Sequence, residues 1–165
     1  AGLALAATNA KAPTDAQRSA WSSWEERVDA GIRPRALQEE ILGVLLSEEV
    51  RQTRPDLVER TLRMGAQTPP AQLVAQLRLQ ATRTDLRPGL KGLRMPTLIV
   101  SGERDALCPP TFHDEIAVCI PHAQRVTLAA GHLIPLERPD AFGAALRDWR
   151  AGLSPAPSAA SRSAT

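Results

Sequence analysis

The 165-residue chain carries 20 basic and 18 acidic residues, so its net charge is only +2. Its arginines lie scattered among aspartates and glutamates, and this pattern argues against nucleic acid as a partner. Two cysteines are too few for a disulfide scaffold, and no apolar run approaches the roughly 18–20 residues of a membrane-spanning helix. We therefore expect one globular domain, without membrane contact, in a reducing cytoplasmic compartment.

The chain opens with a short apolar run, LALAAT, that ends in Thr8 and is followed by Asn9. A run without alternating polar residues is typical of a strand buried on both faces in a parallel sheet, although the pattern alone does not distinguish it from a helix segment. We predict a core strand within residues 1–12. Because a buried strand needs neighbours and the chain does not begin with Met, we also expect that part of the protein precedes Ala1.

Residues 13–90 have the pattern of four short helices in succession, with no strand between them. Thr14 suits the N-cap of the first helix, and Gly31 suits the position after its end. A proline stands where the first turn of each later helix is expected: Pro34, Pro55 and Pro70. We predict that these helices form one insert.

The pattern changes after residue 90. The β-branched run PTLIVSG predicts a strand over 97–100, and RVTLA predicts another over 125–129. Between them, TFHDEIAVCI has apolar residues at helical spacing, so the order strand, helix, strand predicts a parallel α/β sheet. A last helix is expected from RPDAFGAALRDWRAGL, and the small, polar tail 154–165 is expected to be disordered.

Two candidate catalytic side chains follow the predicted strands. Asp105 comes after the strand at 97–100 and His132 after the strand at 125–129, so a parallel sheet would bring both to one edge, where ligands bind in open α/β folds. A carboxylate that accepts the Nδ1 proton of an imidazole orients the ring and leaves Nε2 free to act as a base. The alternative is that Asp105 only forms a turn and His132 only completes a loop.

Three stretches resemble, in order and spacing, the C-terminal part of the α/β-hydrolase superfamily: MPTLIVSGERDALCPP, IPHAQRVTLAAGH and LERPDAFGAALRDW. The resemblance covers about residues 95–150. It implies that Asp105 is the acid and His132 the general base of a catalytic triad. It also implies that residues 1–12 correspond to the sixth strand of that fold, that 13–90 form a helical cap or lid, and that 91–153 form the C-terminal core.

The nucleophile of such a triad is not present in this chain, which contains no Gly-x-Ser-x-Gly motif. The resemblance implies that an upstream part of the same protein completes the fold and supplies it. An upstream serine would give hydrolysis of an ester, lactone or similar acyl bond in a small molecule, whereas an aspartate would give dehalogenase or epoxide-hydrolase chemistry. No metal or organic cofactor is implied. The alternative is a truncated, non-catalytic hydrolase half that acts as a binding or assembly module.

Five other side chains lie outside the predicted Asp105–His132 pair and are candidates for packing or for contact with the site. Trp21 and Trp24 lie three residues apart on one helical face, and with Met64 they are candidates for substrate contact if the insert is a lid; ordinary packing is the alternative. Cys108 lacks the strand-to-helix elbow of a nucleophile, so a structural role is favoured. Glu137 is expected to pack near the N-terminus of the last helix and to take no part in catalysis.

Overall fold

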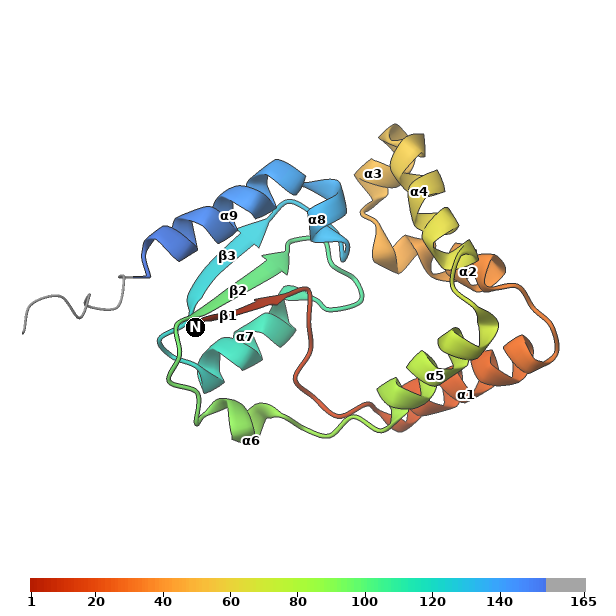
Figure 1. The fold of residues 1–165 in the computed structure, drawn as a ribbon, viewed down its shortest axis with the longest axis horizontal. Helices are drawn as coiled ribbons and strands as arrows, with labels where there is room; N and C mark the ends of the chain where they lie inside the picture. The colour runs from red at the N-terminus through yellow and green to blue at the C-terminus, as the bar shows by residue number, and fades with distance from the viewer. Residues whose placement is uncertain (154–165) are drawn as a thin grey trace, which may run out of the picture.

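A three-stranded parallel sheet with the order β1-β2-β3 forms the centre of the fold (Figure 1). The computed structural model describes residues 1–153, and its strands are β1 (Leu3–Ala6), β2 (Thr97–Gly102) and β3 (Gln124–Leu128). Residue Leu3 pairs with Thr97 at one end of the β1–β2 ladder, and Gly102 pairs with Leu128 at the end of the β2–β3 ladder. The predicted parallel α/β sheet is therefore confirmed.

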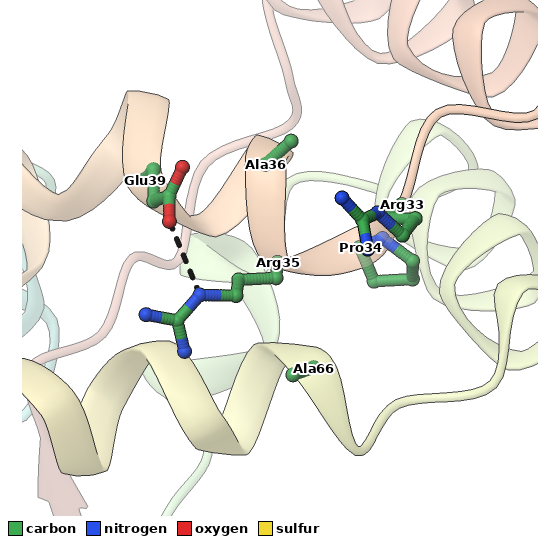
Figure 2. Close-up of a pocket in the computed structure, with 6 residues that line it drawn as sticks. All are labelled: Arg33, Pro34, Arg35, Ala36, Glu39 and Ala66. Atoms are coloured by element: carbon green, nitrogen blue, oxygen red, sulfur yellow. Dashed lines mark hydrogen bonds and ion pairs between the residues drawn. The ribbon is translucent and has the colours of Figure 1, made fainter.

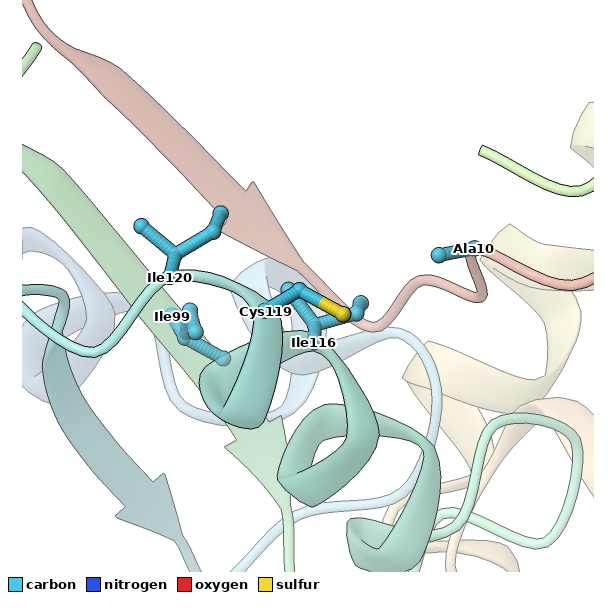
Figure 3. Packing of buried hydrophobic residues seen from close by; sticks show 5 residues of the cluster. All are labelled: Ala10, Ile99, Ile116, Cys119 and Ile120. Carbon is cyan, nitrogen blue, oxygen red and sulfur yellow. The ribbon is translucent and has the colours of Figure 1, made fainter. Parts of the chain in front are cut away.

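Strand β2 is the central strand, and all six of its residues are buried. Ile99 faces helix α7 (Pro110–Cys119), where it packs with Ile116, Cys119 and Ile120 (Figure 3). The alternate residues Leu98 and Val100 belong to a cluster on the other face, against which helix α9 (Pro139–Ala151) packs. The period-two alternation of a strand thus places one helix on each face of the sheet.

Strand β1 is less buried than its apolar sequence predicts. Leu5 packs against the cluster under α7 and Ala6 against the cluster under α9, but Ala4 is exposed. Within residues 1–153, β1 pairs with β2 alone, so one of its edges has no neighbouring strand in that part of the chain. The prediction of a strand buried on both faces is met only in part for this reason.

Six helices connect β1 to β2: α1 (Asp15–Asp29), α2 (Pro34–Leu45), α3 (Glu48–Thr53), α4 (Pro55–Ala66), α5 (Pro70–Ala81) and α6 (Arg87–Leu90). The four predicted helices are present. Thr14 forms a capping box with Gln17 at the start of α1, and Gly31 follows that helix with a φ of +91°, which favours glycine. The short helices α3 and α6 were not predicted, because six and four residues are too few to show a helical period.

Most of this helical segment, residues 13–90, lies beyond the ends of the strands at which β2 and β3 finish, whereas its last helix, α6, lies beside α7 (Figure 1). Helix α1 packs on α5, and α2 packs on α4. The helical segment contacts the rest of the fold through an apolar cluster of Leu46, Val50 and Leu57, against which Leu133 and Leu136 pack. No helix in residues 1–153 combines the length and apolar character needed to cross a membrane. The predicted disordered tail 154–165 falls outside the described residues.

Candidate active site

Asp105 lies in a tight loop directly after β2. The loop is fixed by backbone hydrogen bonds to the segment after β3, since the Arg104 amide donates to the Ala130 carbonyl over 2.9 Å. The Asp105 side chain is almost fully buried, and its Oδ1 accepts hydrogen bonds from the amides of Leu107 (2.9 Å) and Cys108 (2.7 Å). Two backbone donors on one oxygen stabilise a buried carboxylate and leave Oδ2 free for another partner.

That partner is His132, from the loop after β3. Its Nδ1 lies 3.0 Å from Oδ2 of Asp105, and 19% of the His132 side chain is exposed. The structure therefore brings together the two residues that the sequence predicted to meet at one edge of the sheet. An Nδ1–H donated to a buried carboxylate fixes the tautomer, so Nε2 is the nitrogen available to take a proton. Within residues 1–153, Nε2 has no hydrogen-bonded side chain.

Glycines allow the two loops to approach each other. A Cβ on Gly102, at the end of β2, would lie 2.4 Å from the carbonyl oxygen of Gly131. A Cβ on Gly131 would lie 2.6 Å from the amide nitrogen of Ser47, in the helical segment. Both distances are too short for any side chain, so the Asp105 loop, the His132 loop and the helical segment meet only because these two positions are glycine.

The surroundings of His132 favour its protonated form. Burial of the ring lowers the pKa of His132, but the hydrogen bond to Asp105 and then the contact with Cys108 outweigh burial, and the pKa is raised to about 9. A group with this pKa binds a proton strongly once it is neutral. The pair of Asp105 and His132 is thus built to stabilise an imidazolium ion, as a general base requires after it has taken a proton.

Cys108 belongs to the same group of side chains. One ligand-type atom each from Asp105, Cys108 and His132 lies within 4.8 Å of the other two, and Cys108 is buried. Oxygen, sulfur and nitrogen donors of this kind suit a thiophilic cation such as zinc. Asp105 already uses both oxygens in hydrogen bonds, so a cation on Oδ2 and Nδ1 would have to replace the proton between them. The absence of a metal stays a prediction.

Glu137 has hydrogen-bond partners that the sequence did not predict, because its buried carboxylate accepts three hydrogen bonds. It ends helix α8 (Ile134–Glu137), and the donors are the Ser47 amide (2.7 Å), the Ser47 hydroxyl (2.8 Å) and the Gly131 amide (2.9 Å). Glu137 is buried just before α9, near the predicted place, but the partners of its carboxylate were not predicted, and its absence from catalysis stays a prediction. A charged residue that follows the apolar run LIPL was the available sign that this carboxylate has buried partners.

The three residues predicted to contact substrate lie in the helical segment. Trp21 and Trp24 are partly buried on α1, whereas Met64 on α4 is half exposed. In the described chain, neither Trp21 nor Trp24 forms a hydrogen bond with Asp105 or His132. Substrate contact stays a prediction for all three residues. This segment contains a hollow of about 560 Å³, and Figure 2 shows the residues that line it. It is lined by residues of α2 and its entry, with Ala66 of α4, and not by Asp105 or His132.

Comparison with solved structures identifies the fold. A thermophilic esterase from Thermogutta terrifontis superposes with a TM-score of 0.86 and 31% identity, over 92% of this chain and 56% of that one. An alpha/beta hydrolase enzyme from a Medee basin deep-sea metagenome library has a TM-score of 0.75 over 93% of this chain and 56% of that one, and its 22% identity bears on the fold alone. The chain belongs to the α/β-hydrolase superfamily.

One curated relative has a name that states its substrate. The chain is 43% identical over 110 residues to a pimeloyl-[acyl-carrier protein] methyl ester esterase from Stenotrophomonas maltophilia. The match covers 66% of this chain and 40% of that protein. No family model matches the chain. The chain thus spans less than half the length of this relative and about half the length of the similar solved structures.

Proposed function

We propose that Asp105 and His132 are the acid and the general base of an α/β-hydrolase that cleaves an ester or similar acyl bond of a small molecule. The single observation that carries the proposal is the 3.0 Å contact between His132 Nδ1 and a carboxylate that is itself buried and bonded to two backbone amides. The name of the relative from Stenotrophomonas maltophilia makes a methyl ester the first substrate to test.

In the proposed mechanism, a nucleophilic hydroxyl from outside residues 1–153 attacks the acyl carbon. His132 takes the hydroxyl proton at Nε2 and later delivers it to the leaving group. Asp105 accepts the hydrogen bond from Nδ1–H throughout and stabilises the imidazolium that forms, without becoming protonated itself. The chain described here supplies the acid and the base of the triad.

The proposal extends to the organisation of the protein. Residues 1–12 would provide a core strand, 13–90 a cap over the catalytic edge, and 91–153 the loops that carry Asp105 and His132. Another part of the same protein would pair with the free edge of β1 and supply the nucleophile. The two cysteines are unpaired in the described chain, as suits the reducing cytoplasmic compartment that we propose.

Labelling by a fluorophosphonate probe tests the proposal on the full-length protein that contains this chain. We expect one labelled serine outside residues 1–153, identified by mass spectrometry, and loss of labelling when His132 is replaced by alanine. His122→Ala is the matched control, because His122 is exposed and, among the described residues, its side chain bonds only to the Met95 carbonyl. A folded protein that takes up no label would instead support an aspartate nucleophile or a non-catalytic binding module.

A further inference from the structure

The start of helix α3 and the loop that carries His132 are held together by buried hydrogen bonds. Glu137 joins the two: its Oε1 accepts from the Ser47 amide, and its Oε2 accepts from both the Ser47 hydroxyl and the Gly131 amide. Ser47 and Glu137 are each 3% exposed. Three donors on a carboxylate removed from water make a strong and directional attachment.

A second bond lies on the other side of His132. The Leu133 amide donates to the Leu45 carbonyl over 3.1 Å. Both neighbours of His132 in the sequence are therefore held by residues 45–47, Gly131 through the Glu137 carboxylate and Leu133 directly. The backbone at His132 has little freedom to rotate unless one of these attachments breaks.

Apolar packing and surface charge connect the same regions. Leu133 and Leu136 pack against the apolar cluster that contains Leu46 and Val50. At the surface, Glu49 of α3 is paired with Arg104, which precedes Asp105, and with Arg138, which follows Glu137. The ion pairs are exposed and contribute little free energy. They show, however, that the first turn of α3 contacts the loop of Asp105 and the residue that follows helix α8.

We infer that Glu137 is a positioning residue, whose carboxylate ties the start of α3 to Gly131 and thereby holds the His132 ring against Asp105. A displacement of the helical segment at Ser47 would then be transmitted to His132. The consequence for catalysis rests on the proposed function, whereas the effect on the geometry of His132 does not.

The test is Glu137→Gln in the full-length protein. An amide has one acceptor oxygen and directs its NH₂ group at a backbone or hydroxyl donor, so at least one of the three bonds is lost. We expect the His132 ring, followed by NMR, to titrate at a lower pH than the wild type, because its contact with Asp105 loosens. We expect kcat for an ester to fall roughly tenfold to hundredfold, as for one lost buried bond to a charged group, with KM changed less than kcat.

Glu48→Gln is the matched control, because Glu48 is an exposed acid next to Ser47 in the first turn of α3, and within residues 1–153 its side chain bonds only to Gln52. An unchanged His132 titration in a folded Glu137→Gln protein would overturn the inference. If that variant does not fold, Ser47→Ala removes one donor and is measured in the same way, and an unchanged titration there would overturn it too. A shifted titration in a protein that fluorophosphonate does not label would retain the positioning role and reject the proposed function.

Discussion

Carboxylates differ in burial and in hydrogen-bond partners between the edge of the sheet and the helical segment. Asp105 and Glu137, near the ends of β2 and β3, are buried, and each accepts three hydrogen bonds. In the helical segment, carboxylates lie at the surface and pair with arginines: Arg27 with Glu40, Arg35 with Glu59, and Arg78 with Glu25. Burial therefore decides whether a charge fixes the position of other groups, since exposed pairs are screened by water.

The largest effect is expected from a change to a buried carboxylate. Asp105→Asn in the full-length protein should lower kcat for an ester by about 10⁴-fold, because the amide does not hold the His132 tautomer that leaves Nε2 free as a base. Ester turnover measures the change, and circular dichroism checks that the fold is retained. Asp85→Asn is the control, since Asp85 is exposed and pairs with Arg87. A loss of less than tenfold would contradict the assignment of Asp105.

An intermediate effect is expected from pH. His132 has a pKa raised to about 9, so it is mostly protonated near neutral pH and acts as a base only in its neutral fraction. The kcat/KM for an ester should therefore rise about tenfold for each pH unit below pH 9 and level off above it.

Cys108 offers a way to sharpen this prediction. The contact of Cys108 with His132 raises the pKa of His132, so Cys108→Ala should move the pH profile of kcat/KM to lower pH. Cys119→Ala is the matched control, because Cys119 is also buried but packs under α7 with Ile116. A profile that is the same in both variants would show that Cys108 does not influence the base.

The smallest effect is expected from changes to the exposed ion pairs of the helical segment. Arg35 pairs with Glu39 on α2 and with Glu59 on α4, yet all three side chains are well exposed. Arg35→Gln should barely change the midpoint of urea unfolding. Leu37→Ala, on the same helix, removes a buried side chain and should cost about 2–5 kcal/mol of unfolding free energy. Comparable shifts for the two variants would mean that the surface pairs stabilise the helical segment more than we infer.

The sequence was most informative where a short-range rule determines the structure. Thr14 predicted the start of α1 because its side chain bonds within three residues, and prolines predicted the starts of α2, α4 and α5. The meeting of Asp105 and His132 was also predictable, because it follows from two parallel strands that end at one edge. The catalytic roles of these two residues stay a proposal.

The helix α3 and the identity of the partners of Glu137 were not predictable from the sequence. Six residues show no helical period, and nothing local indicates that Ser47 lies beside Glu137, 90 residues later in the chain. The gathering of Cys108 with Asp105 and His132 was likewise not expected as a structural feature, because a thiol three residues after an aspartate has no fixed direction until the loop is folded.

The sequence by itself thus determined the strands, the longer helices and the edge at which Asp105 and His132 emerge, because hydrophobic period, caps and strand direction act over a few residues. Only the tertiary structure decided which buried groups hold His132 in place. Those contacts join residues 45–47, 131–133 and 137, and they depend on how the helical segment packs against the loop after β3, which residues far apart in the sequence decide together.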